Sequence, residues 1–297
     1  MHKPSSAPPG RLARLWVACQ RLLPQHALSA LMYRLTRLRL GPLTTLTIRA
    51  FVAAFRVDLA AAAEPRAAAY PSFNAFFTRA LHADARPLPA AGAALVCPVD
   101  GCISQCGPIR GGQLIQAKGQ TFGLAALLGG DTALAARFDA GDFATLYLSP
   151  RDYHRIHMPC DGQLQRTLHV PGRLFSVNRT TAALVPGLYA RNERLVCVFA
   201  SAAGPLVLVL VGAIFVGGIE TVWTGPITPP RGRQLQARDC GAQGPILARG
   251  AELGRFNMGS TVILLTAPGQ VDWAPGLAPG VPVRCRASLG RLTGVAG

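Results

Sequence analysis

The chain has 297 residues, half of them hydrophobic, so it can bury a substantial core and is not a disordered polypeptide. Its formal net charge is +16, and no apolar run clearly reaches the roughly 18 to 20 residues that cross a bilayer as a helix. The N-terminus lacks a good signal peptide, so the eight cysteines are predicted to be reduced thiols. Cys97, Cys102 and Cys106 lack the spacing of common zinc sites, and no metal is expected.

The first fifth of the chain is basic and is predicted to be helical. Residues 1–57 contain nine Lys or Arg residues and no Asp or Glu. Apolar residues recur at helical spacing over 12–23 and over 28–38, with arginines off the apolar stripe and Pro24 between the two stretches. A third apolar stretch, 44–63, is also predicted to be helical.

This segment is suited to an anionic surface, either acidic lipid or nucleic acid. Basic amphipathic helices with Leu and Trp on the other face lie in membrane interfaces, and aromatic residues are too sparse here for stacking on bases. An anionic membrane surface is therefore the expected partner, and nucleic acid is not. The alternative is that the apolar stripes pack on the protein's own core.

From about residue 95 onward the chain is predicted to form strands. Short Val- and Ile-rich runs are separated by Gly, Pro, Asn and Asp, and one short helix is expected over 121–128. The expected strands include 143–148, 163–170, 194–200, 206–211 and 261–266. The predicted class is α+β, with a helical membrane-associating segment over 1–69 and a mostly antiparallel β sandwich or barrel domain over 70–297.

Three segments of the β-rich region carry groups that could do chemistry. They are Cys97 to Gly101, Tyr147 to Pro159 and Phe256 to Thr261. The first presents Asp100 in a turn, the second contains His154 and His157, and the third presents Ser260 before an apolar strand. Taken singly, each has a structural explanation as a turn cap, a buried imidazole or a Gly-Ser turn. On a strand, the two histidines face opposite sides and would hold one metal poorly, which favours proton transfer.

Together these segments resemble the phosphatidylserine decarboxylase family. The family's Tyr-x-x-Pro-x-Asp-Tyr-His-Arg-x-His-x-Pro signature is present in full over 147–159. Residues 97–101 resemble its Ser-Pro-x-Asp-Gly with Cys97 in place of Ser, and residues 256–261 resemble its Leu-Gly-Ser-Thr cleavage site with Met258 in place of Leu. The resemblance covers about 70–266 and includes further matches at 76–79, 86–88, 174–178 and 211–213.

The resemblance implies a peripheral membrane enzyme on the cytoplasmic face of the bacterial cell membrane. It implies that phosphatidylserine is converted to phosphatidylethanolamine and carbon dioxide through a Schiff base with a pyruvoyl cofactor. That group would form from Ser260 when the chain cuts itself between Gly259 and Ser260. The resulting β-chain, 1–259, and α-chain, 260–297, would stay together as a heterodimer.

The resemblance also assigns roles to four expected catalytic residues. His157 would be the base that activates Ser260, with Asp100 as its orienting partner, and His154 would serve the decarboxylation step. A purely structural role for His154 remains an alternative.

Three other functions remain open on the residues themselves. The first is a serine hydrolase that uses Ser260, His and Asp without cutting itself. The second is a non-catalytic β domain that binds membranes or nucleic acid. The third keeps the same chemistry but acts on another phospholipid with a serine headgroup.

Overall fold

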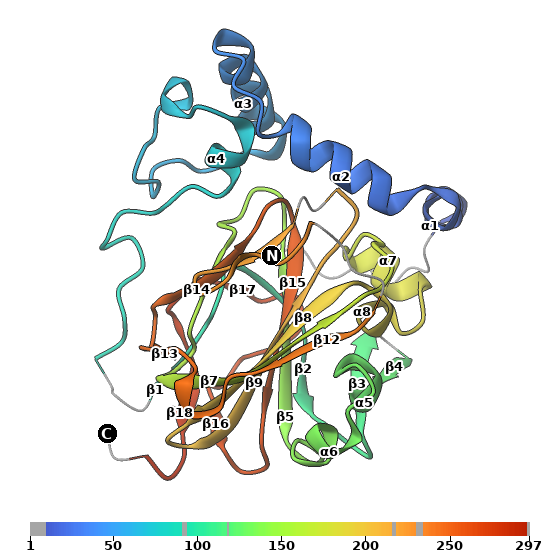
Figure 1. Ribbon diagram of the computed structural model, residues 1–297, viewed down its shortest axis with the longest axis vertical. Coiled ribbons are helices and arrows are strands. Elements are labelled where there is room, and N and C mark those ends of the chain that lie inside the picture. The colour runs from blue at the N-terminus through green and yellow to red at the C-terminus, as the bar shows by residue number, and fades with distance from the viewer. Residues whose placement is uncertain (1–9, 91–93, 118, 216–217, 230–233, 296–297) are drawn as a thin grey trace.

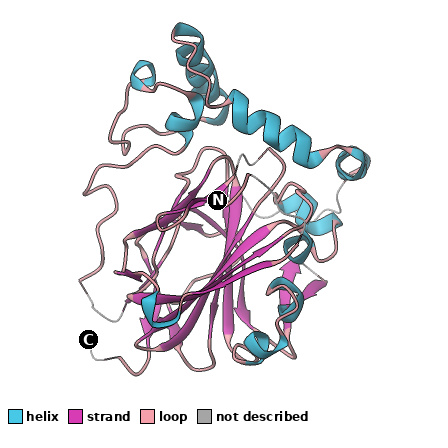
Figure 2. Cartoon of the chain, viewed as in Figure 1, coloured by secondary structure: helices cyan, strands magenta, loops and turns pink. Residues whose placement is uncertain are grey.

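The computed structural model describes residues 10–90, 94–117, 119–215, 218–229 and 234–295. Its elements separate into a layer of N-terminal helices and a larger β-rich body, as Figures 1 and 2 show. The expected α+β class, with a helical segment before a mostly antiparallel sheet domain, is confirmed.

The helical layer begins with three helices, whose starts follow breaks in the sequence. They are α1 (Arg11–Leu22), α2 (Gln25–Leu35) and α3 (Pro42–Phe55). Pro24 separates the first two helices, and Pro42 opens the third after Gly41, where φ is 56°. Proline is tolerated in a first helical turn because no N–H donor is needed there.

The third helix ends at Phe55, so the expectation that it extends to residue 63 is wrong. Arg56 adopts the left-handed conformation at φ 54°, and the Val57 N–H donates to the Val52 carbonyl at 3.0 Å. This arrangement closes a helix by satisfying carbonyls of its last turn. Apolar composition alone does not mark such an end, because the residues beyond it are still mostly alanine and leucine.

Much of the outer surface of the helical layer is apolar. Its exposed large hydrophobic side chains are Leu12, Leu15, Trp16, Leu22, Leu31, Leu35, Leu38, Leu40, Leu43, Leu46 and Phe55. Among the residues described, no helix has both the length and the apolar character that a membrane crossing requires.

An aromatic cluster follows the three helices. The 3-10 helix η1 (Ala67–Ala69) precedes α4 (Phe73–Phe77), where the Ser72 hydroxyl accepts a hydrogen bond from the Ala75 N–H at 3.2 Å. Phe76 and Phe77 of α4 are buried together with residues of α3 and its C-terminal turn. Residues on both sides of the boundary expected at 69/70 therefore share one small core.

The main sheet in the described part of the chain contains nine strands, all paired antiparallel. Its order is β12, β7, β8, β9, β15, β5, β2 and β17, with β13 also pairing with β7. All five expected strands are present. The bounds are β2 (Gly101–Pro108), β5 (Asp142–Leu148), β7 (Gly162–Val170), β8 (Arg194–Ser201), β9 (Gly204–Val211), β12 (Gln236–Asp239), β13 (Ile246–Leu247), β15 (Ser260–Thr266) and β17 (Pro282–Val283).

Smaller sheets and short helices surround the main sheet. A sheet in the order β11, β10, β14 and β6 carries part of the site, and β1, β18 and β16 form another. The bounds are β1 (Ala94–Val96), β6 (Arg155–His157), β10 (Ile219–Thr221), β11 (Gly225–Pro226), β14 (Glu252–Phe256), β16 (Val271–Trp273) and β18 (Ser288–Leu292). The short helices are α6 (Thr132–Ala136), α7 (Arg179–Leu184), α8 (Leu188–Arg191) and the 3-10 helix η2 (Gly241–Gln243).

The helix expected over 121–128 is only partly correct. Its first residues belong to β4 (Gln120–Gly123), which pairs with β3 (Gln113–Ala117), and only α5 (Leu124–Leu127) is helical. Phe122 packs edge-on against Tyr189 at 5.6 Å between ring centroids, so tertiary contacts favour the strand there.

Candidate active site

Ser260 lies in the interior of the protein, at the start of β15. It pairs with Leu148, the last residue of β5. Its side chain is fully buried, and its Oγ has no hydrogen-bond partner among the described residues. A buried hydroxyl without a partner is unfavourable and uncommon in a native fold. The position is therefore better explained by chemistry than by a contribution to stability.

The turn before Ser260 is strained. Met258 has a φ of 110°, a conformation that is unfavourable for a residue with a side chain. A Cβ built on Gly259 would meet no atom within 4 Å, so there is space beside this residue. Strain at the preceding residue and space at Gly259 are both compatible with a reaction at the Gly259 carbonyl.

His154 is brought to the same corner of the β-rich body by a loop. The chain leaves β5 at Leu148 and returns so that the Phe256 N–H donates to the His154 carbonyl at 3.0 Å. The loop is held by Asp152, whose Oδ2 accepts from both the N–H and the Oγ of Ser149 at 2.7 Å. The loop before His154 is thus joined to residues 256–260 at both ends, because Leu148 pairs with Ser260 and His154 bonds to Phe256.

The His154 ring is fully buried and has one free nitrogen. Its Nδ1 lies 2.8 Å from the Asp152 carbonyl, which can only accept, so Nδ1 carries the proton. Nε2 therefore keeps a lone pair, and it has no partner among the described residues. Burial lowers the pKa of His154 to about 3. The Phe77 ring of α4 covers the imidazole, with 4.2 Å between ring centroids.

The His157 ring has both nitrogens engaged. Nδ1 donates to the Gly250 carbonyl at 2.8 Å, and the Tyr153 hydroxyl donates to Nε2 at 2.9 Å. Burial lowers the pKa of His157 and raises the pKa of Tyr153, which favours a neutral ring and a protonated hydroxyl. The free lone pair of His154 thus distinguishes the two histidines.

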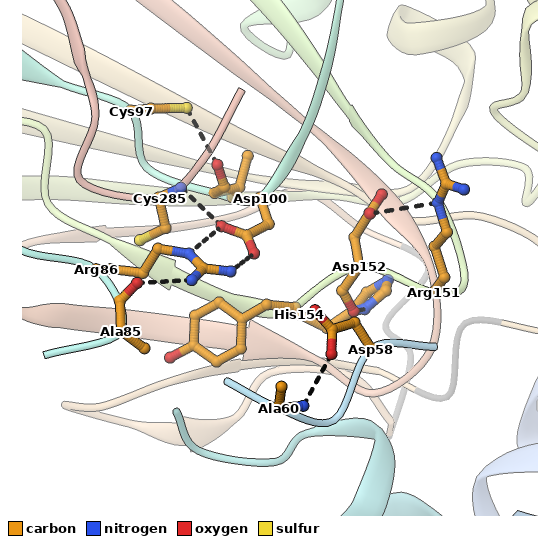
Figure 3. Close-up of polar contacts among 12 residues, drawn as sticks. Asp58, Ala60, Ala85, Arg86, Cys97, Asp100, Arg151, Asp152, His154 and Cys285 are labelled. Atoms are coloured by element: carbon orange, nitrogen blue, oxygen red, sulfur yellow. Dashed lines mark hydrogen bonds and ion pairs between the residues drawn. The ribbon is translucent and has the colours of Figure 1, made fainter. Parts of the chain in front are cut away.

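Asp100 is held in an ion pair with Arg86 (Figure 3). Arg86 donates to both carboxylate oxygens, at 3.0 Å from Nε and 2.5 Å from Nη2, and the Cys285 N–H donates to Oδ1 at 2.7 Å. The His157 N–H donates to the Pro98 carbonyl at 2.8 Å, so His157 lies close to the turn that contains Asp100.

The side-chain pairing expected between Asp100 and His157 is not formed in this structure. Arg86 and the Cys285 N–H occupy the carboxylate of Asp100, while Gly250 and Tyr153 occupy the imidazole of His157. Sequence reasoning missed all four of these partners. Arg86 and Tyr153 lie within the recognised motifs, but their spacing does not indicate what they contact. Gly250 and Cys285 lie outside those motifs.

An apolar pocket of about 480 Å³ lies between the helical layer and the turn before Ser260. Residues of α2 and α3 form most of its wall, together with Phe73 and Met258. Met258 also packs against the aromatic cluster of α3 and α4. The pocket therefore extends to a residue that is two positions before Ser260.

Cys97 and Cys285, two cysteines near Asp100, are buried, and burial raises the pKa of both thiols. All eight cysteines are free, and the pKa of Cys97 rises to about 12, which keeps this thiol protonated and unreactive. Within the described residues, no group of three His, Cys, Asp or Glu side chains could hold a metal ion.

Sequence comparison gives a consistent set of similarities. The profile described as phosphatidylserine decarboxylase matches residues 73–291, and a second profile, described as PSD, matches residues 15–56. The phosphatidylserine decarboxylase proenzyme of Acidovorax ebreus (strain TPSY) is 54% identical over 282 residues, which cover 95% of this chain and 99% of the relative. The proenzyme of Delftia acidovorans (strain DSM 14801 / SPH-1) is 57% identical over 252 residues, covering 85% and 88%. That of Methylococcus capsulatus (strain ATCC 33009 / NCIMB 11132 / Bath) is 50% identical over 277 residues, covering 93% and 96%.

Proposed function

The chain belongs to the phosphatidylserine decarboxylase family, and we propose that it is the precursor of an enzyme that converts phosphatidylserine to phosphatidylethanolamine and carbon dioxide. The observation that carries this proposal is the buried hydroxyl of Ser260, which has no hydrogen-bond partner in the described chain and follows a strained turn. Chemistry at that hydroxyl removes no side-chain hydrogen bond among the described residues.

The first reaction is proposed to be self-cleavage between Gly259 and Ser260. The Ser260 Oγ attacks the Gly259 carbonyl, and the peptide bond becomes an ester as the amide nitrogen takes up a proton. Loss of the Ser260 α-proton then expels the Gly259 carboxylate and leaves a dehydroalanine. Water hydrolyses this group, releasing ammonia and leaving a pyruvoyl group at the new N-terminus.

The two histidines are proposed to act at different stages. His157 is the base for self-cleavage. For this role the Tyr153 hydroxyl must either leave Nε2 of His157 or relay the Ser260 proton to it. Asp100 must also leave Arg86 before it can orient the His157 ring. His154 serves decarboxylation, because a substrate carboxylate beside its buried ring would raise the pKa that burial has lowered. A protonated ring could then return a proton to carbon.

The residues around Ser260 fit a pyruvoyl group. The keto oxygen would stand on Cα in place of the Ser260 amide nitrogen, because Oγ leaves with the Gly259 carboxylate, and the neighbouring Thr261 Oγ1 is a buried hydroxyl without a partner among the described residues. The group would supply an electrophilic carbonyl that captures the amine of the lipid and accepts the electron pair released with carbon dioxide. Ser260 is fully buried, so a group formed there would be shielded from water.

A lipid substrate in an acidic membrane is supported by the helical layer. Residues 1–57 carry nine basic and no acidic side chains, and α1 to α3 expose many large apolar side chains. The pocket of about 480 Å³ links these helices to Met258 and is lined almost entirely by apolar groups. We propose that it admits the acyl part of the substrate, with the protein bound peripherally at the cytoplasmic face of the membrane.

The decisive experiment measures the intact mass of the purified protein beside its Ser260→Ala variant. Two fragments that meet between residues 259 and 260 are expected, the smaller with a blocked keto N-terminus, and neither should form in the variant. The mature protein should release carbon dioxide from phosphatidylserine in mixed micelles. His157→Ala should remain uncut, whereas His154→Ala should be cut but release carbon dioxide at least about a hundredfold more slowly.

An uncut wild-type chain that reacts with a fluorophosphonate at Ser260 would instead identify a serine hydrolase. Cleavage in His157→Ala together with an uncut His154→Ala chain would exchange the roles of the two histidines. A cut protein that acts on another serine phospholipid but not on phosphatidylserine would show that the proposed substrate is wrong and that the proposed reaction type is right.

A further inference from the structure

A second cavity, of about 310 Å³, is polar and lies beside the loop that precedes His154. Asp152 and Tyr153, the residues directly before His154, form part of its wall, and so does Arg56 at the end of α3. Five arginines line it together with three aspartates, a formal excess of two positive charges. The arginines are Arg56, Arg79, Arg86, Arg151 and Arg284.

Arg79 is the unusual member of this set because it is buried without a carboxylate partner. It is only 5% exposed, it forms no ion pair within the described residues, and its Nε has no hydrogen-bond partner there. Its Nη2 donates to the Arg151 carbonyl at 3.2 Å, and its guanidinium lies 5.4 Å from the centroid of the Phe76 ring. Burying a guanidinium in this way is unfavourable unless an anion completes the site.

The three carboxylates of the cavity form no ion pair with Arg79, and they are fewer than its five arginines. Asp100 is paired with Arg86, as Figure 3 shows, and Asp58 accepts from the Ala60 N–H at 2.8 Å. Asp152 accepts from Ser149, and the nearest arginine nitrogen to it is that of Arg151, at 3.9 Å.

We propose that this arginine-lined cavity binds the phosphodiester anion of the phospholipid headgroup, with Arg79 as its central donor. Guanidinium groups match phosphate oxygens in geometry and charge, and a buried one binds more strongly than an exposed one. The cavity borders both the loop before His154 and the end of α3, so a headgroup held here adjoins one of the proposed membrane-binding helices and the segment that carries His154. This inference rests on the proposed function, because it assigns a site to part of its substrate.

Binding is tested in the Ser260→Ala protein, which keeps the cavity and cannot mature. Calorimetric titration with glycerophosphoserine at low salt should give saturable binding. Arg79→Gln should weaken it at least about tenfold and Arg284→Gln by a smaller factor. The matched control is Arg137→Gln, an exposed arginine at the end of α6, which should leave binding unchanged.

Inorganic phosphate distinguishes a headgroup site from a general anion site. Phosphate should compete with glycerophosphoserine and bind more weakly, because it lacks the rest of the headgroup. Phosphate binding that glycerophosphoserine does not displace would overturn the proposal, and so would equal affinities of wild type and Arg79→Gln for glycerophosphoserine.

The mature enzyme gives an independent measurement. Arg79→Gln should raise KM for a short-chain phosphatidylserine about tenfold or more while kcat changes little, because the phosphodiester does not react. If Arg79→Gln fails to fold or mature, the double variant of the exposed Arg56 and Arg284 to Gln carries the same expectation, and an unchanged KM would overturn the proposal. A wild-type chain that binds glycerophosphoserine but neither cuts itself nor releases carbon dioxide would overturn the proposed function, while the proposed anion-binding site would stand.

Discussion

His154 and Ser260 share a property that distinguishes them from Asp100 and His157: each is fully buried and keeps one polar atom without a partner in the described chain. Each such atom costs about 1–3 kcal/mol of folding free energy. Asp100 and His157 are also buried, but all their polar atoms have partners. Asp100 and His157 must therefore exchange their present hydrogen-bond partners before the proposed self-cleavage can begin, whereas His154 and Ser260 need not.

The lowered pKa of His154 predicts a loss of stability in mild acid. The folded ring has a pKa of about 3 and the unfolded ring one of about 6.5, so between these values the unfolded chain binds the extra proton. Stability is present above the unfolded pKa and falls as the pH drops. In the uncut Ser260→Ala protein, the contribution of His154 should fall by about 2 kcal/mol between about pH 7 and about pH 5.

Urea unfolding at the two pH values, with and without His154→Asn, measures this contribution. The variant should lose less stability on acidification than its parent, because asparagine does not titrate. Equal losses in the two proteins would mean that the ring is not buried as a neutral imidazole.

At the scale of elements, α1 and α2 are attached to the β-rich body through two glutamines. Gln20 accepts from the Ser176 N–H and Gln25 accepts from the Leu174 N–H, each at 2.8 Å, and both glutamines are buried. Deleting the first 24 residues would therefore remove a structural contact as well as any membrane contact. Point substitutions on the outer face separate the two effects.

Leu12 and Leu15 are 84% and 61% exposed on α1, so replacing both with Gln should leave the melting temperature nearly unchanged. Binding to vesicles rich in acidic phospholipid should fall at least about tenfold, since each leucine contributes about 1.5–3 kcal/mol when buried in lipid. Co-sedimentation of the purified variant measures this loss.

Ile246→Gln is the matched control for that experiment, because Ile246 is 76% exposed on β13 in the β-rich body. The control should bind vesicles like wild type. Equal loss in the control and in the Leu12 and Leu15 variant would argue against α1 as the membrane contact.

For the whole molecule, the proposed cleavage point lies where the main sheet is best protected. β15 begins at Ser260 and is buried over its full length between β5 and β9. The strands after it pair with distant parts of the chain, β17 with β2 and β18 with β1. Residues 260–292 thus contribute strands to two sheets and are not a detachable tail.

The two fragments of the mature protein should therefore co-purify as a heterodimer. Native size-exclusion chromatography should give one peak containing both, and the fragments should separate only in concentrated denaturant, because the interface is the protein's own core. Separation of the fragments in native buffer would contradict this topology.

The sequence by itself determined the class of fold, the five long strands and the segments that carry the chemistry. These are local properties: hydrophobic periodicity follows backbone geometry, and the histidine signature is contiguous over 147–159. It did not determine where α3 ends, because a left-handed residue such as Arg56 has no compositional signal.

Only the tertiary structure decided which side chains meet. Asp100 contacts the N–H of Cys285, 185 residues away, and the His157 ring contacts the carbonyl of Gly250, 93 residues away. Such contacts depend on strand register and on loop paths across several sheets, so they cannot be predicted from spacing along the chain. The same applies to Arg79, which is buried and donates to the carbonyl of Arg151, 72 residues away.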